Sequence, residues 1–186
     1  MTTTLTLVAH ALTPGLRGLV LGGESVPDQA GLEAARDVRV DAGTTYCGPE
    51  PAAILTAEAI GLQPVVVGAL RDREYGDWTG RDLEELLTSE TAAVSAWLER
   101  PHTAPPGGET ANDLIARVAD WLGDLTEDPG HAERRTVVAV VHPAVVRAAV
   151  LYALEAPAES LRHVDVRPLA TVGLSAHATS WSLNLH

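Results

Sequence analysis

The sequence TVVAVVH at residues 136–142 is a run of apolar and β-branched residues that ends in a histidine. Such a run is typical of a central strand in a parallel sheet, which is buried on both faces. A second strand is predicted at residues 4–9, and it too is followed by a histidine, His10. Residues just past the carboxyl ends of parallel strands line the ligand crevice of an open α/β sheet. We therefore expect His10 and His142 at one edge of the sheet, where imidazoles are suited to nucleophilic or acid–base chemistry on a small molecule.

Strand and helix patterns alternate along the rest of the chain. Helices are predicted at residues 28–37, 52–60, 82–87, 92–98, 110–125 and 144–154. Further strands are predicted at residues 38–40, 44–47, 65–67, 164–166, 171–174 and 181–185. A loop is predicted at residues 13–23. Asp28 is a predicted N-cap, and Thr110 with Asp113 resembles a capping box. The alternation predicts one domain over residues 1–186 with an α/β fold, a three-layer αβα sandwich around a mostly parallel central sheet. The short helices of residues 82–99 are expected to form a cap over the sheet edge.

The composition narrows the range of partners and compartments. The formal net charge is −12, and all 13 cationic side chains are Arg because the chain has no Lys. An acidic surface repels nucleic acid and anionic membranes, so we expect neither as a partner. A single Cys excludes an internal disulfide framework, and no apolar run approaches the ~20 residues of a membrane span. With no signal-peptide pattern at the N-terminus, these features predict a cytoplasmic protein.

The segment of residues 70–80 is dense in charge and contains two glycines. One interpretation is a solvated loop with internal ion pairs. The other is a loop over the carboxyl edge of the sheet that brings a carboxylic acid to the histidines. In that second interpretation Asp72 is the candidate general acid, and Glu74 is the second candidate.

Other charged residues near these segments have both structural and functional interpretations. Glu109 precedes the helix at 110–125, where it either stabilises the helix N-terminus or reaches the site, and the first role is slightly favoured. Arg147 is expected in a structural role. Arg17 is the only cation that closely follows His10, so it is the best candidate for an anion contact. No spacing of histidines or carboxylates predicts a metal site, and we expect neither a metal nor an organic cofactor.

Five segments, in order, resemble motifs of the histidine phosphatase superfamily, which has the fold of phosphoglycerate mutase. The family's Arg-His-Gly appears as Ala-His-Ala at residues 9–11, and its Ser-Pro-x-x-Arg-Ala-x-x-Thr-Ala appears at residues 48–57. The family's Leu-x-Glu-x-x-x-Gly-x-Trp-x-Gly corresponds to residues 70–80, with Asp72 in place of Glu. Gly-Gly-Glu-Ser corresponds to residues 107–110, and Ser-His-Gly-Gly-x-x-Arg to residues 141–147. The resemblance covers nearly the whole chain, and it implies the phosphoglycerate-mutase-like fold and a possible homodimer.

The resemblance also implies a role for each matching residue. His10 would attack phosphorus, His142 would help to hold the phosphoryl oxygens, and Asp72 would protonate the leaving group. Two family arginines that hold the phosphoryl oxygens correspond to Ala9 and Ala52. Removing one fixed donor to developing charge typically costs about 3 kcal/mol of transition-state stabilisation, so the loss of both arginines predicts impaired phosphomonoesterase activity.

Three functions remain open on this basis. In the first, the chain is a repurposed enzyme that uses the cleft of His10, His142 and Asp72 on a small, less charged substrate. In the second, it is a weak phosphomonoester hydrolase that works through phospho-His10, with Arg17 or Arg71 replacing the lost cations. In the third, it is an inactive binding or scaffold protein.

Overall fold

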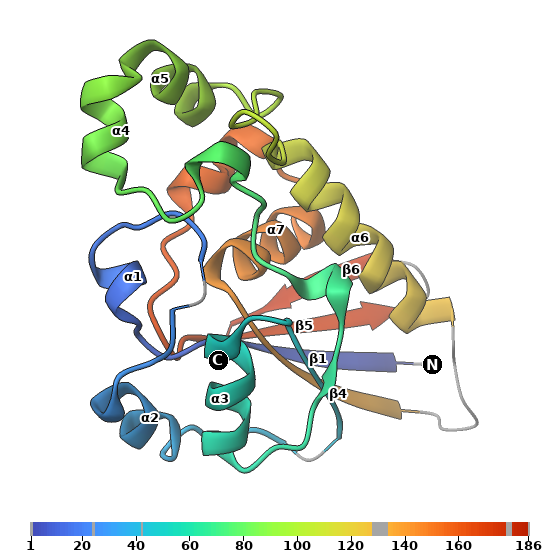
Figure 1. Ribbon diagram of the computed structural model, residues 1–186. Helices are drawn as coiled ribbons and strands as arrows, with labels where there is room; N and C mark the ends of the chain where they lie inside the picture. Colours follow the sequence, from blue (N-terminus) through green and yellow to red (C-terminus); the bar gives the residue numbers. More distant parts are fainter. Residues whose placement is uncertain (1, 24, 42, 128–133, 178–179, 186) are drawn as a thin grey trace.

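The computed structural model describes residues 2–23, 25–41, 43–127, 134–177 and 180–185, and its centre is a six-stranded sheet (Figure 1). The strand order is β3-β2-β4-β1-β5-β6. The strands are β1 (Thr2–Ala9), β2 (Thr44–Cys47), β3 (Val65–Val66), β4 (Arg134–Val141), β5 (Thr171–His177) and β6 (Ser180–Asn184). Strands β1 to β4 are parallel to one another, whereas β5 pairs antiparallel with β1 and β6 pairs antiparallel with β5. The sheet is therefore mostly parallel, as the sequence predicted.

The two central strands, β1 and β4, bring the two histidines to the same edge. Their register pairs Leu5 with Val137 and continues without a break to Ala9 opposite Val141. His10 and His142 directly follow this last pair, and the His10 amide donates to the Val141 carbonyl at 2.9 Å. The expected convergence of the two strand ends follows from this register.

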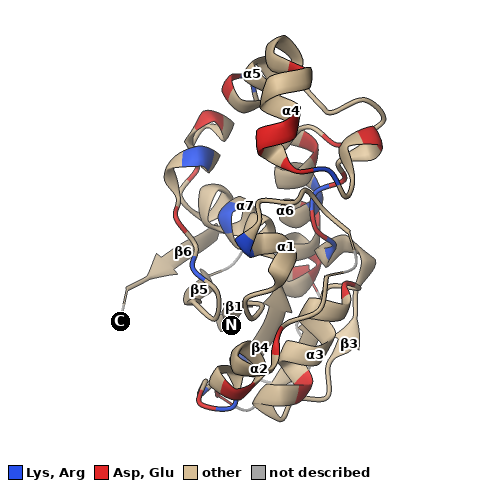
Figure 2. Cartoon of the chain, turned by 60° about the vertical axis from the view of Figure 1, so that its left-hand side comes forward, with Lys and Arg blue, Asp and Glu red and all other residues tan. Residues whose placement is uncertain are grey.

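Helices cover both faces of the sheet and make three layers (Figures 1 and 2). On one face, α6 (Ala111–Glu127) and α7 (Pro143–Ala153) pack on the larger apolar cluster, which contains Leu5, Leu7 and Val137. On the other face, α2 (Gln29–Ala35) and α3 (Pro51–Ile60) are associated with Val8, Val138 and Val140. Alternate residues of β4 face opposite clusters because side chains alternate along a strand.

Two short helices, α4 (Leu83–Ser89) and α5 (Thr91–Glu99), lie over the edge where β1 and β4 end (Figure 1). They bury Leu86 and Val94 against Trp78 in a separate small cluster. The start of α4 is tied to the segment that follows β1, because the Leu83 amide donates to the Leu19 carbonyl at 3.1 Å. These helices lie on the side of the sheet edge where the sequence predicts a cap.

The short elements include α1 (Pro14–Arg17) and three 3₁₀ turns, η1 (Gly68–Leu70), η2 (Gly76–Trp78) and η3 (Ala158–His163). The predicted N-cap is confirmed, since the Asp28 carboxylate accepts from the Gly31 amide at 2.8 Å. The predicted capping box is confirmed by reciprocal hydrogen bonds between Thr110 and Asp113.

Three predictions of local structure are wrong. Residues 164–166 form no strand, because they follow η3 and the Val164 carbonyl accepts from Arg147 rather than from a strand. Residues 38–40 are not part of the sheet, and the predicted loop at 13–23 contains α1. Within the described residues, no helix is both long enough and apolar enough to cross a bilayer.

Candidate active site

The two histidines lie side by side at the carboxyl edge of the sheet. Their ring centroids are 5.1 Å apart, with the ring planes tilted by 47°. Both rings line a small cavity of about 40 Å³. The other described residues that line it are Thr13, Gly15, Leu16, Val20, Gly22, Gly23, Ser25, Glu50, Ala52 and Asp72. The structure thus brings together His10, His142 and Asp72, three residues that the sequence nominated from distant segments.

His10 is held in a defined protonation state. Its side chain is only 3% exposed, and Nδ1 lies 2.7 Å from the Ala11 carbonyl oxygen. Because a carbonyl oxygen only accepts, Nδ1 carries the proton and Nε2 keeps its lone pair. Burial, together with the neighbouring His142, lowers the pKa of His10 to about 4. His10 is therefore a neutral imidazole at pH 7, with Nε2 as its nucleophilic or basic atom.

His142 is paired directly with Asp72. Its Nδ1 atom lies 2.7 Å from Oδ1 of Asp72, and both side chains are largely buried. The Ala144 amide, in the first turn of α7, lies 3.2 Å from the same Nδ1. The shorter contact makes Asp72 the principal partner, so one proton is shared between the carboxylate and the imidazole. Such a pair is able to deliver a proton to a substrate or to take one from it.

Glu50 is a site residue that the sequence interpretation missed. Its Oε1 accepts from the Asp72 amide at 2.6 Å, and its buried Oε2 has no hydrogen-bond partner among the described residues. Burial raises the pKa of this carboxyl above its usual value. Its position in the sequence could have indicated this role, because Glu50 follows β2, a parallel strand that ends at the same edge as β1 and β4. Glu50 positions Asp72 and adds a second carboxyl group to the cavity.

The loop that carries Asp72 is anchored by a buried ion pair. Arg117 of α6 contacts both carboxylate oxygens of Glu109, at 2.9 and 2.7 Å, and also donates to the carbonyls of Ala69 and Arg71. Glu109 is 7% exposed and is not among the residues that line the histidine cavity. Its contacts with Arg117 give it a structural role as an anchor for the segment that precedes Asp72, which differs from the helix N-terminal role that the sequence slightly favoured.

Two glycines allow this loop to approach residues 105–109. A Cβ atom on Gly76, whose φ is +52°, would lie 2.1 Å from the Pro106 carbonyl oxygen. A Cβ on Gly108 would lie 2.6 Å from the Glu74 carbonyl oxygen. Only glycine fits at these points, so the two loops are locked together and hold Asp72 in place.

The expected cations do not line the histidine cavity. Among its described lining residues there is no Arg. Arg17 is 62% exposed and pairs with Asp28 at 3.0 Å. Arg71 pairs with Glu74 at 2.7 Å, and both of these residues line a neighbouring cavity of about 320 Å³ that shares Glu50 and Asp72 with the first.

Ala9 and Ala52, which the sequence resemblance matches to family arginines, differ in their surroundings. Ala52, near the start of α3, lines the histidine cavity. Ala9 is fully buried in the main apolar cluster and is not among the described lining residues. Figure 2 shows Asp and Glu on both cap helices, in keeping with the acidic chain. The cavity therefore presents two imidazoles and two carboxyl groups, with no guanidinium among the described residues that line it.

Comparison with known proteins supports the fold and the lineage. The family model for the histidine phosphatase superfamily, branch 1, matches residues 28–186. In Mycobacterium tuberculosis, "Bifunctional protein Rv2228c" is 28% identical over 130 residues, which are 69% of this chain and 35% of that protein. Glucosyl-3-phosphoglycerate phosphatase of the same organism is 34% identical over 101 residues, 52% of this chain and 45% of that protein. The matches thus span less than half the length of these curated relatives.

Solved structures agree over nearly the whole chain. The mycobacterial glucosyl-3-phosphoglycerate phosphatase superposes with a TM-score of 0.84 at 24% identity, covering 100% of this chain and 98% of the other. The α-ribazole phosphatase from Shigella flexneri gives a TM-score of 0.82 at 23% identity, with 98% and 95% covered. These identities support a shared fold, and the family model adds the lineage. The chain belongs to branch 1 of the histidine phosphatase superfamily.

Proposed function

We propose that this protein is a repurposed small-molecule enzyme that acts at an uncharged reacting centre, with little activity toward phosphomonoesters. His10 supplies the nucleophile or base, and the Asp72–His142 pair supplies or removes the proton of the leaving group. These roles are the ones that the family resemblance implies, a nucleophilic histidine and a proton donor, but the substrate does not place a phosphate dianion between the histidines.

The observation that carries the proposal is the charge of the cavity. The transition state of phosphoryl transfer is stabilised mainly by cations and donors around the phosphoryl oxygens. The described residues around His10 include Glu50 and Asp72 and no Arg. A dianion placed there would meet two carboxyl groups without a guanidinium to offset them. An uncharged electrophile, such as a carboxylic ester, carries no such cost.

The protonation state of His10 supports a catalytic role. The Ala11 carbonyl holds the proton on Nδ1, and the lowered pKa keeps Nε2 unprotonated at neutral pH. An unprotonated imidazole within reach of a proton-carrying pair is the arrangement needed for attack at one atom and protonation at another.

A second candidate is weak phosphomonoester hydrolysis through phospho-His10. The neutral His10 favours it, as does the similarity to a protein named glucosyl-3-phosphoglycerate phosphatase. In this alternative, Arg71 would have to leave Glu74 and turn into the cavity, a change that gives up the 2.7 Å ion pair.

Matched chromogenic esters separate the candidates. We expect p-nitrophenyl acetate to be hydrolysed in a His10-dependent manner, with p-nitrophenyl phosphate turned over at least about 100-fold more slowly, the cost of one or two missing oxyanion donors. His10→Ala is the control, because surface histidines also react slowly with activated esters. His10-dependent turnover of the phosphate ester with no turnover of the acetate would favour the second candidate. No His10-dependent turnover of either ester would point to the inactive binding protein.

A further inference from the structure

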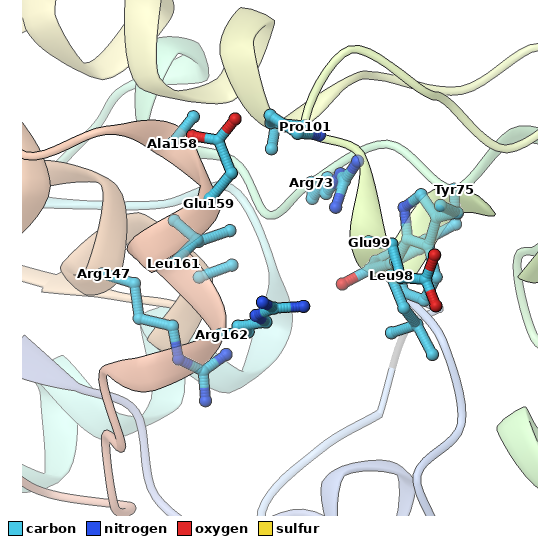
Figure 3. A pocket seen from close by; sticks show the side chains of 13 residues that line it. Arg73, Tyr75, Leu98, Glu99, Pro101, Arg147, Ala158, Glu159, Leu161 and Arg162 are labelled. Atoms are coloured by element: carbon cyan, nitrogen blue, oxygen red, sulfur yellow. The ribbon is translucent and has the colours of Figure 1, made fainter. Parts of the chain in front are cut away.

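A pocket of about 260 Å³ lies beside the histidine cavity, between the cap and the segment that follows α7 (Figure 3). One wall carries Arg147 and Arg162, and the opposite wall carries Tyr75, Leu98 and Glu99. This pocket is outside the constellation of His10, His142 and Asp72, and none of the candidate roles above uses it.

The pocket adjoins the reacting groups on two sides. Ala144, which lines it, follows His142 by two residues and has its amide 3.2 Å from the His142 ring. Arg73 and Tyr75 line both this pocket and the cavity that contains Asp72 and Glu50. A small molecule in the pocket would therefore lie next to the turn that carries His142 and next to the cavity that contains Asp72.

The two arginines of the first wall have no carboxylate partner within 4.0 Å among the described residues. Arg147 is half-buried, and its Nε donates to the Val164 carbonyl at 2.8 Å, which holds the guanidinium in position. Among the described residues, the one hydrogen bond of the Arg162 side chain is from Nε to the neighbouring His163 ring at 3.3 Å, and in Figure 3 the side chain extends from this wall toward the opposite one. In both residues the terminal nitrogens remain available to an acceptor.

The other charged groups of the pocket leave these two arginines free. The guanidinium of Arg73 is already bound by other groups, because it donates to the Glu109 carbonyl at 2.9 Å and lies 5.0 Å over the Trp97 ring. Glu159 is on the same wall as the arginines, but its carboxylate extends to the far end of that wall in Figure 3. Glu99 belongs to the opposite wall. In a chain with 25 acidic and 13 cationic side chains, two unpaired arginines in one pocket are a specific feature.

We propose that this pocket binds the anionic group of a small organic substrate, a carboxylate or a phosphate, through Arg147 and Arg162. Guanidinium groups present planar pairs of donors that match the oxygens of such groups. Trp97 and Leu161 supply apolar surface for the body of the molecule. The identification of this ligand as the substrate rests on the proposed function. The substrate would then be a molecule with an uncharged reacting group at His10 and an anionic group at its distal end.

Benzoate and phenylphosphonate are suitable probes for binding, which is measured by isothermal titration. At this size we expect dissociation constants on the order of 1 mM. Arg162→Gln removes the charge of an exposed side chain, and Arg147→Lys keeps the charge but loses the planar pair of guanidinium donors. Each substitution should weaken binding about tenfold. Arg167→Gln removes the same charge from an exposed residue that is close to Arg162 in the sequence and does not line the pocket, and it should leave binding within about twofold of the wild type. The two probes distinguish a carboxylate site from a phosphate site.

A binding constant that is unchanged in both pocket variants would overturn the proposal, as would the absence of binding to either probe. Turnover then tests the link to catalysis. Arg162→Gln should lower the ratio of kcat/KM for 4-acetoxybenzoate to kcat/KM for p-nitrophenyl acetate about tenfold, whereas Arg167→Gln should leave that ratio unchanged. Benzoate binding that persists in His10→Ala, combined with ester turnover that does not depend on His10, would retain the anion site and reject the proposed function.

Discussion

Nδ1 of His142 lies 2.7 Å from Oδ1 of Asp72, so the proposed acid and the second histidine form one proton-sharing unit. The sequence resemblance matches Asp72 to a glutamate, which is longer by one methylene. The shorter side chain is compensated by its surroundings, because the Asp72 amide is held by Glu50 and its carboxylate accepts from the Arg73 amide at 2.6 Å. Asp72 is thus directed to His142 by contacts on both sides.

The Asp72–His142 pair predicts a dependence on the leaving group. Asp72→Asn should slow the hydrolysis of phenyl acetate about 100-fold, because phenolate needs a proton in order to leave. The same change should have little effect on p-nitrophenyl acetate, since nitrophenolate leaves without protonation. Steady-state kcat values for the two esters provide the measurement, and His10→Ala should abolish both reactions. An equal loss on both esters would show that Asp72 acts only through structure.

Glu50 is proposed as a positioning residue. Two substitutions separate its role as a hydrogen-bond acceptor from its role as an ionisable carboxyl group. Glu50→Gln keeps a carbonyl oxygen for the Asp72 amide and should leave phenyl acetate turnover within about threefold of the wild type. Glu50→Leu removes that acceptor and should lower turnover about tenfold. The pH profile of kcat should be displaced in the Leu variant only. Equal activity in the two variants would argue against positioning through this hydrogen bond.

The lowered pKa of His10 predicts both a spectroscopic and a stability effect. In a histidine-selective NMR titration, the signal of His10 is identified as the one that is missing from the spectrum of His10→Gln. This ring should stay neutral down to about pH 4. The unfolded chain binds this proton at the ordinary histidine pKa of ~6.5. Between pH 6.5 and 4 the unfolded state therefore binds more protons, and stability falls as the pH is lowered. The loss due to His10 is on the order of 3 kcal/mol at most, measured by urea unfolding at several pH values. A titration midpoint near 6.5 would contradict the buried, neutral imidazole.

The buried pair of Glu109 and Arg117 predicts a large stability effect. Glu109→Gln leaves the Arg117 guanidinium without its anionic partner, and the free energy of unfolding should fall by about 3 kcal/mol. Glu85→Gln is the matched control, because its pair with Arg81 is exposed and should contribute less than about 1 kcal/mol. Urea unfolding measures both variants. Similar losses in the two variants would show that the Glu109–Arg117 pair does not anchor the loop.

Much of the fold could be predicted because it depends on local patterns. The apolar run that ends at His142 fits only a buried strand, and the capping residues Asp28 and Thr110 mark helix starts through side-chain hydrogen bonds with nearby amides. The segment at 164–166 shows the limit of such patterns. Its valines resemble a strand, but the Val164 carbonyl is taken by Arg147, a contact between residues that are distant in the sequence.

The candidate site could be predicted in part for the same reason. The ends of β1 and β4 gave His10 and His142, and the charged loop gave Asp72. Glu50 was missed because its role depends on a hydrogen bond to the Asp72 amide across two segments. Arg17 was nominated by its closeness in sequence to His10, yet the structure places it on the surface beside Asp28. Sequence distance does not indicate which way a loop side chain points.

The proposed function depends most on one claim: the described residues that line the histidine cavity do not supply the cationic charge that stabilises phosphoryl transfer. Ala52 lines that cavity at the position of a family arginine, so Ala52→Arg should return one cation to it. The decisive measurement is kcat/KM for p-nitrophenyl phosphate in the wild type, Ala52→Arg and the uncharged control Ala52→Gln. We predict a low wild-type value that rises at least about tenfold in Ala52→Arg and not in Ala52→Gln. A wild-type value above about 10⁴ M⁻¹ s⁻¹ that Ala52→Arg does not increase would contradict the account.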